Sequence, residues 1–222
     1  MALKFDPDYL LLAVTDKQWE KTSDFKLIRR DIGKIKIITG KLVACDPFFL
    51  RHREIAFTQT LPVGEHLVRI TIVRFANSGD ERIAFANIRL SDNKPVRWEM
   101  MIFPGQDVSK LSNKEFVGYG VDSRAGCFVD EKVTQYLQKN KDNRRAILDK
   151  LGDELDGRYQ STRTWGNLDI DDGNIIAFFS GWGDGSYPTF AGFDENNQLA
   201  AVVTDFMVFY HEYHNPPEDS EN

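Results

Sequence analysis

The hydrophobic pattern of this chain changes from strand-like alternation to a helical repeat and then back to alternation. Between residues 66 and 74, Val68, Ile70 and Ile72 share one face, which is the period expected of a half-buried strand. Turns rich in Gly, Pro, Asn and Asp separate this run from similar ones. The strand-like runs cover residues 35–45, 54–60, 66–74, 82–90 and 96–103. The last four of these runs follow one another at a spacing of about ten residues, which is typical of an antiparallel meander in a sandwich or barrel.

Apolar positions three and four residues apart predict two short helices between residues 131 and 155. Asp130 is a suitable N-cap for the first helix. Upstream, Asp6-Pro7 is suited to opening a short helix. The strand pattern resumes near residue 164. We therefore predict an α+β fold, predominantly antiparallel β, as a sandwich or an open barrel with a two-helix insertion around 131–155.

The same patterning divides the chain into three parts. Residues 1–33 are expected to form an N-terminal extension packed on the domain, and residues 34–210 a single mostly-β domain. Residues 211–222 carry two prolines and four acidic residues without a basic one, which predicts a flexible tail. Nothing in the sequence fixes the oligomeric state.

Charge and composition narrow the classes of partner and location. A net charge of −6 argues against binding to nucleic acid or to an anionic membrane surface. No apolar run approaches the roughly 20 residues that span a bilayer, and the N-terminus does not resemble a secretory signal. Cys45 and Cys127 are too far apart in sequence to form a Cys-x-x-Cys motif. These features predict a cytoplasmic protein with two reduced, buried thiols.

The stretch from Ser180 to Pro188 is the most distinctive part of the sequence. Its three alternate glycines and its closing proline predict a tight turn between two apolar runs. Trp182 and Tyr187 supply amphipathic rings, and Asp184 and Ser186 supply polar groups, so we expect these four residues to bind a ligand. The alternative is that the loop only connects two strands.

Three resemblances to known binding motifs fail on spacing. The glycines at 181, 183 and 185 do not match the dinucleotide or P-loop patterns. Residues 169–174 look like the start of a calcium loop, but the glycine comes one residue early, so an acidic β-turn is favoured. His211 and His214 are three residues apart, whereas a zinc-protease helix needs four. We therefore predict no metal site and no cofactor.

The candidates for catalysis are a set of loop carboxylates and one thiol. They are Asp122, Cys127, Asp130 and Asp184. Two carboxylates can share acid–base or hydrolytic chemistry if they converge, but Asp in glycine-rich turns also bonds its own backbone. Cys127 has mostly acidic neighbours, which disfavours a reactive thiolate. Asp122 and Ser123 are also candidates for ligand binding, on a second glycine-rich stretch.

Two stretches together resemble an uncharacterised bacterial family. They are Gly120-Val121-Asp122-Ser123 with Gly126-Cys127-Phe128 and Asp130, and Gly181-Trp182-Gly183-Asp184-Gly185 with Tyr187-Pro188. With Gly40-x-Leu42, Asp46-Pro47 and Val203-Thr204-Asp205-Phe206, the chain resembles domain of unknown function (DUF) family 4241 from about Ile38 to Phe209. The resemblance implies one domain, and the family has no established activity that could be transferred to this chain.

The leading hypothesis is a cytoplasmic module that binds a small molecule or a protein partner, with the two glycine-rich loops on one surface. The alternatives are a hydrolase that uses the loop aspartates and a structural β scaffold with its interface elsewhere. An enzyme is the least favoured of the three. The carboxylates decide between them, because groups more than about 10 Å apart cannot share a reacting atom or a metal.

Overall fold

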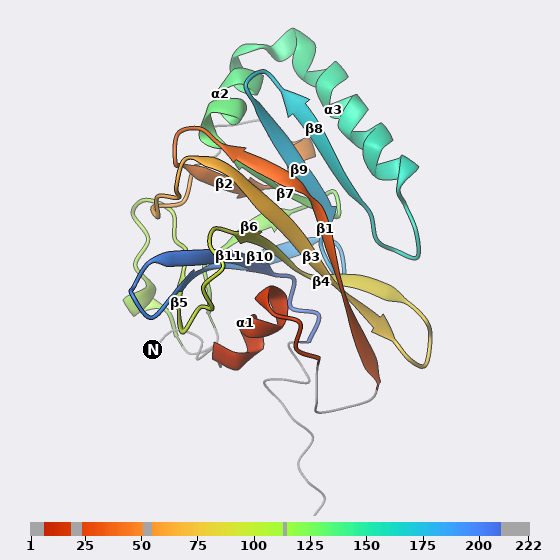
Figure 1. Cartoon of the computed structure of the whole chain (residues 1–222). Helices are drawn as coiled ribbons and strands as arrows, with labels where there is room; N and C mark the ends of the chain where they lie inside the picture. Colours follow the sequence, from red (N-terminus) through yellow and green to blue (C-terminus); the bar gives the residue numbers. More distant parts are fainter. Residues whose placement is uncertain (1–6, 19–23, 51–54, 113–114, 210–222) are drawn as a thin grey trace, which may run out of the picture.

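Two antiparallel sheets face each other in the computed structural model, which describes residues 7–18, 24–50, 55–112 and 115–209. Two helices cover the outside of the smaller sheet, and a short N-terminal helix lies against the outside of the larger one (Figure 1). The layers are therefore helices, sheet, sheet and helix. This confirms the predicted α+β fold, which is predominantly antiparallel β.

The larger sheet contains seven strands. In sheet order, six of them are β1 (Phe25–Ile37), β3 (Gly64–Phe75), β4 (Glu81–Arg89), β11 (Leu199–Asp205), β10 (Gly185–Phe193) and β5 (Arg97–Met100). The seventh, β6 (Gly118–Val121), pairs with the first half of β10, whereas β5 pairs with the second half. Because β10 is shared in this way, the loop before it lies next to the turn that follows β6.

The smaller sheet carries the helical layer. Its order is β2 (Leu42–Cys45), β7 (Ala125–Asp130), β9 (Gly173–Phe179) and β8 (Trp165–Ile170). Helices α2 (Glu131–Lys139) and α3 (Lys141–Gly157) lie on its outer face (Figure 1), which confirms the predicted two-helix insertion. Among the described residues, no helix is both long and apolar enough to cross a bilayer.

Alternation along β9 shows how the two sheets share the core. Ile176 and Phe178 pack between the sheets, whereas Ile175 and Ala177 pack under the helices beside Val133. A strand that is covered on both faces reads as a continuous apolar run, as residues 175–179 do. Burial of such side chains stabilises the fold by about 1.5–3 kcal/mol each.

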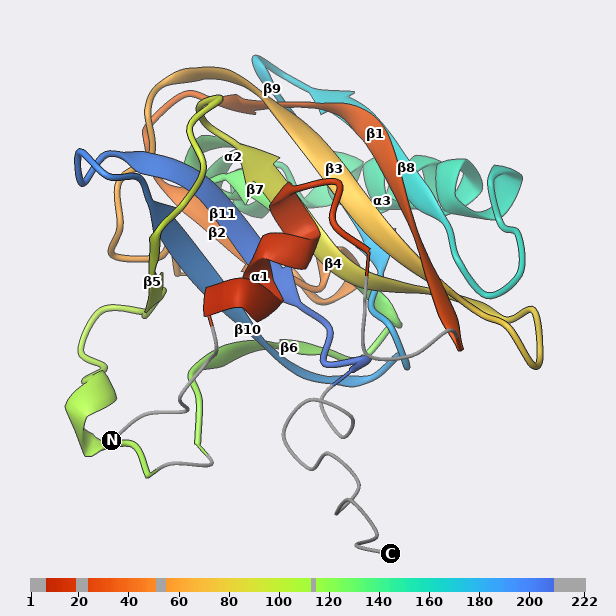
Figure 2. The same ribbon diagram turned by 60° about the horizontal axis from the view of Figure 1, so that its bottom comes forward.

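Helix α1 (Pro7–Val14) covers part of the larger sheet (Figure 2). The ring of Tyr9 meets Phe85 edge-on, with 5.3 Å between centroids. The side-chain amide of Asn87 donates to the carbonyl oxygen of Ala13 at 2.7 Å, which satisfies one of the last carbonyls of the helix. The expected short helix opened by Pro7 is therefore present, and the predicted boundary between residues 33 and 34 falls inside β1.

One predicted strand is wrong. Residues 55–59 form no strand, and Ile55, expected to point inward, is 52% exposed. Phe57 and Leu61 donate single backbone bonds to Leu42 and Gly40, so the segment crosses the edge of β2 instead of pairing along it.

Two short 3-10 helices, Pro47–Phe49 and Val108–Lys110, are also part of the described structure. The predicted tail at 211–222, with His211 and His214, lies outside the described residues.

Candidate ligand-binding site

The glycine loop at residues 180–184 joins β9 to β10 and is fixed from below by hydrogen bonds. The backbone N–H of Ser180 donates to the carbonyl of Arg124 at 2.9 Å, and that of Gly183 donates to Ser180 at 2.6 Å. The hydroxyl of Tyr187 donates to the carbonyl of Gly183 at 2.6 Å. The loop is therefore a fixed corner of the structure.

Gly181 explains why the loop needs glycine. Its φ is +48°, and a Cβ atom there would lie 2.9 Å from Cγ2 of Val208 and 3.0 Å from Cβ of Phe206. A side chain would therefore clash with the core as well as strain the backbone. The close approach holds the loop against the segment after β11 and turns the next residue outward.

That next residue, Trp182, is 58% exposed. The guanidinium carbon of Arg82 lies 4.8 Å from the centre of its ring, which is cation–π geometry. Phe75 supports the ring from β3, with 5.9 Å between ring centroids. Tyr159, 56% exposed, lies across a hollow of about 210 Å³ whose lining also includes Arg124. We call Arg82, Arg124, Tyr159 and Trp182 the Trp182 surface.

Arg82 is held in place by a neighbouring carboxylate. Its Nε donates to Asp80 at 2.8 Å, and Thr162 donates to the same carboxylate at 2.7 Å. Burial raises the pKa of Asp80, but the bonds from Thr162 and Arg82 outweigh it, so the pKa lies below its ordinary value. Asp80 therefore stays ionised and fixes Arg82 above the indole ring.

The second glycine-rich stretch lies beside the first, as the sequence predicts. Gly185 pairs with Val121 and Ser186 with Gly120, so Asp122 and Ser123 follow directly in the adjoining turn. Asp122, Asp184 and Ser186 are exposed, and Ser123 is half-buried. Tyr187 is different: its ring is buried beneath the loop, where its hydroxyl binds backbone carbonyls. A role for Tyr187 in binding would therefore act through the shape of the loop.

Asp46, which the sequence does not nominate for the site, anchors this adjoining turn. Its buried carboxylate accepts the backbone N–H groups of Asp122 and Ser123 at 2.8 and 2.6 Å, and the hydroxyl of Ser123 at 2.7 Å. A fourth bond comes from the N–H of Phe48. Arg124, next in the chain, then receives the bond from Ser180. Asp46 thus holds the turn at 122–124 directly, and through Arg124 it supports the glycine loop as well.

We expect Asp46→Ala to lower the free energy of unfolding by about 2–4 kcal/mol, because it leaves three backbone N–H groups, those of Phe48, Asp122 and Ser123, without this acceptor. Urea denaturation measures the change. Asp122→Ala is the matched control: it removes an exposed carboxylate in the same turn, and its effect should stay within about 0.5 kcal/mol. Equal stability of the two variants would contradict this role of Asp46.

Asp130 lies at the other end of β7 from these loops. Its carboxylate, fully buried, accepts the N–H groups of Ile38, Thr39 and Lys132 at 2.9 Å each, and so caps α2. The five residue steps along β7 span about 17 Å. Asp130 therefore does not converge with Asp122 and Asp184, and the four candidate catalytic residues do not form one site.

Cys127, also buried, points to the helical side of the smaller sheet, where its sulfur lies 3.6 Å from that of Cys45. Cys45 lines a larger pocket of about 470 Å³ between η1 (Pro47–Phe49), residues 103–106 and β6. Phe49, Phe103 and Tyr119 make this pocket partly aromatic. Asp122 lies on its lining, so the turn 122–124 separates the pocket from the Trp182 surface.

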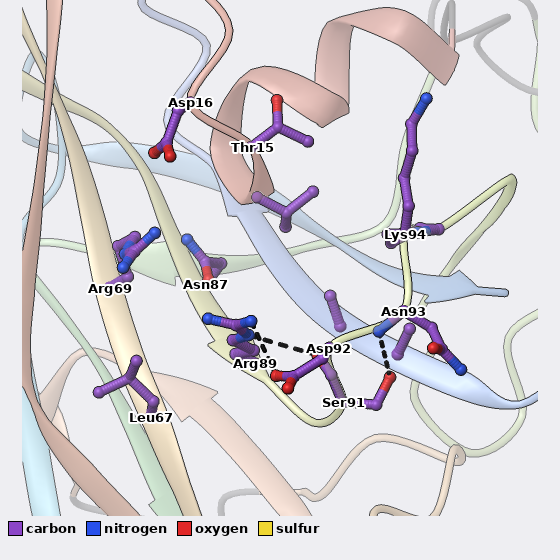
Figure 3. A pocket seen from close by; sticks show the side chains of 14 residues that line it. Thr15, Asp16, Leu67, Arg69, Asn87, Arg89, Ser91, Asp92, Asn93 and Lys94 are labelled. Atoms are coloured by element: carbon purple, nitrogen blue, oxygen red, sulfur yellow. Dashed lines mark hydrogen bonds and ion pairs between the residues drawn. The ribbon is translucent and has the colours of Figure 1, made fainter.

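A third cavity, of about 200 Å³, lies between the end of α1 and the loop after β4 (Figure 3). Two arginines on its lining form ion pairs, one with an aspartate of the lining and one with an aspartate of β1. Arg89 contacts Asp92 at 2.7 Å, and Arg69 contacts Asp31 at 2.5 Å. Among the described residues, no three His, Cys, Asp or Glu side chains are grouped so that they could hold a metal.

These features define a mostly-β α+β protein with a candidate site on two adjoining glycine-rich loops. A family model described as protein of unknown function, DUF4241, matches residues 35–204, and the chain belongs to this family. The match confirms the resemblance seen in the glycine and aspartate motifs. No curated protein and no solved structure is significantly similar to the chain.

Proposed function

We propose that this protein is a binding module whose partner docks on the Trp182 surface. The observation that supports the proposal most is an indole ring more than half exposed on a loop that hydrogen bonds hold from below. Exposed Trp residues are enriched among the residues that contribute most to protein interfaces. A ring that is already fixed loses little conformational entropy on binding.

The charges beside the ring indicate the chemistry of the partner. Arg82 is neutralised by Asp80, whereas Arg124 has no salt bridge within the described part of the chain. Arg124 lines the same hollow as Trp182 and Tyr159. A guanidinium beside two rings suits a protein segment that presents a carboxylate next to an aromatic or aliphatic side chain.

The hydrolase alternative has less support. The carboxylate of Asp130 caps α2 and lies about 17 Å from the turn at residues 122–124. Cys127 is buried beneath the helical layer. Asp122 and Asp184 remain near one another, but neither is buried. Exposed carboxylates of this kind lack the enclosed setting in which enzymes carry out acid–base work.

We expect Trp182→Ala to reduce recovery of the partner about tenfold or more while leaving the fold intact, since truncation of a central Trp costs about 2 kcal/mol or more. The measurement is affinity capture with quantitative mass spectrometry. Val63→Ala is the matched control, because Val63 is an apolar residue, 70% exposed, on a different turn. Arg124→Gln should weaken capture less and should reduce its dependence on salt.

A partner recovered equally by the wild-type chain, Val63→Ala and Trp182→Ala would contradict the assignment of the Trp182 surface. Circular dichroism and the melting temperature of each variant show whether the fold is intact. Tyr187 is unsuitable for this test, because its hydroxyl holds the loop and its loss would change folding and binding together.

A further inference from the structure

Cys45 and Cys127 lie directly opposite each other on neighbouring strands. The antiparallel register of β2 and β7 pairs the two residues, although they are 82 positions apart in sequence. Their side chains point to the same face of the sheet, and the two sulfur atoms are 3.6 Å apart. Neither cysteine is part of a disulfide in the described structure.

This geometry is within reach of a disulfide without movement of the strands. Directly opposed residues of an antiparallel pair have Cα atoms about 4.5–5.5 Å apart. Disulfides form across Cα separations of about 4.4–6.8 Å. Small rotations about the Cα–Cβ bonds therefore suffice to close the remaining gap between the sulfur atoms.

The pair also has a route to solvent. Cys45 lines the pocket of about 470 Å³ beside η1, and two of the apolar residues on that lining, Phe49 and Ile55, are 40% and 52% exposed. A molecule the size of a peroxide can enter such a pocket. Cys127 lies behind Cys45, enclosed by the sheet and the helices. Cys45, which is 4% exposed and lies on the pocket lining, is therefore more accessible to an oxidant than Cys127, which is 0% exposed.

We propose that Cys45 and Cys127 form a reversible disulfide when the protein meets a peroxide. The Cys45 thiolate attacks one peroxide oxygen, the O–O bond breaks, and a sulfenic acid and hydroxide form. The Cys127 thiolate then attacks the Cys45 sulfur and releases a second hydroxide, which completes the S–S bond. Both hydroxides take up the protons that the thiols lost, so two thiols and one peroxide give one disulfide and two waters.

The cross-link also bears on the adjoining turn. Cys45 directly precedes Asp46, whose carboxylate holds the backbone N–H groups of Asp122 and Ser123. Cys127 lies three residues after Arg124, as the third residue of β7, the strand that follows the same turn. A bond between the two cysteines joins the strands on both sides of this anchor. Oxidation should therefore slow amide hydrogen exchange at residues 122–124. This inference goes beyond the proposed binding function and does not depend on it.

The test is a titration of the full chain with hydrogen peroxide in native buffer, followed by alkylation in denaturant and peptide mass spectrometry. We expect a peptide pair linked through Cys45 and Cys127, loss of two hydrogen atoms from the intact monomer, and full reversal by dithiothreitol. Closing a long loop should raise the melting temperature by about 5–10 °C. Cys45→Ser and Cys127→Ser should each abolish the linked pair and the rise.

Two results would overturn the proposal. One is that both thiols stay open to alkylation at peroxide concentrations that oxidise the half-buried methionines Met100 and Met207. The other is that oxidation yields only sulfinic acids or dimers linked between chains. Because the linked peptides are sought in the wild-type chain, the result stands even if a serine variant fails to fold.

Discussion

Glu81→Ala is expected to lower the free energy of unfolding by about 3–5 kcal/mol, because it leaves a buried guanidinium without a counter-charge. Glu81 and Arg163 are both almost fully buried and form an ion pair, and Arg74 bonds to the same carboxylate. Burial raises the pKa of Glu81, but the hydrogen bonds from Arg163 and Arg74 lower it by more. The pKa of Glu81 therefore lies below its ordinary value. This contribution is present above the ordinary Glu pKa and is lost as the pH falls through the lowered one.

Urea denaturation at neutral pH measures the effect, and Glu99→Ala serves as the matched control. Glu99 also pairs with an arginine, Arg97, but on the surface, where such pairs contribute about 0–1 kcal/mol. If Glu81→Ala destabilises the chain no more than Glu99→Ala, the buried pair does not contribute as we infer. Because Glu81 adjoins Asp80 and Arg82, its loss should also disturb the Trp182 surface.

The second large effect is a loss of stability as the pH rises toward about 7. Asp205 is buried at the end of β11, where its carboxylate accepts the hydroxyl of Tyr9 at 3.2 Å and the N–H of Met207 at 2.7 Å. Burial raises its pKa from 3.8 to about 7, against the opposing effect of these bonds. The folded chain thus keeps a proton that the unfolded chain releases above about pH 4.

Proton linkage gives the direction in which stability changes with pH. The stabilising effect of this proton is complete below the unfolded pKa and is lost as the pH rises toward about 7. Between pH 5.5 and pH 8.5 we expect the wild-type chain to lose about 2 kcal/mol from this group. Asp205→Asn should remove that loss, because an amide carries no charge and its oxygen can accept both bonds.

Urea denaturation at the two pH values, with Asp184→Asn as the exposed control, measures this effect. The control should keep the pH dependence of the wild type, whereas Asp205→Asn should be the more stable protein at pH 8.5. A pH dependence that is the same in all three proteins would show that Asp205 does not retain its proton.

Local pattern was enough to predict much of the fold. The two helices, the acidic turn between β8 and β9 and the β3–β4 hairpin follow from capping residues, alternation and turn residues that act over a few positions. The error at 54–60 has a different origin. Residues 55–59 alternate like a strand, but the edge of β2 offers them only single bonds, which the sequence does not show.

The candidate site was predictable in part for a similar reason. Glycine and tryptophan at 181–183 mark the loop, and pairing of β6 with β10 joins it to the turn at Asp122, as expected. Arg82 and Tyr159 were missed, because they reach Trp182 from β4 and from the segment after α3. The burial of Tyr187 was also missed, because the sequence of a glycine-rich loop does not show whether an aromatic side chain points into the core or toward solvent.

Native mass spectrometry of the gently purified wild-type chain beside Trp182→Ala tests the central claim most directly. If the Trp182 surface captures a partner or ligand, the wild-type spectrum contains a bound species that the variant lacks, while both chains give the same charge-state distribution of a folded protein. A species retained equally by both chains would contradict the claim and would move the search to the pocket beside Cys45 and Phe49.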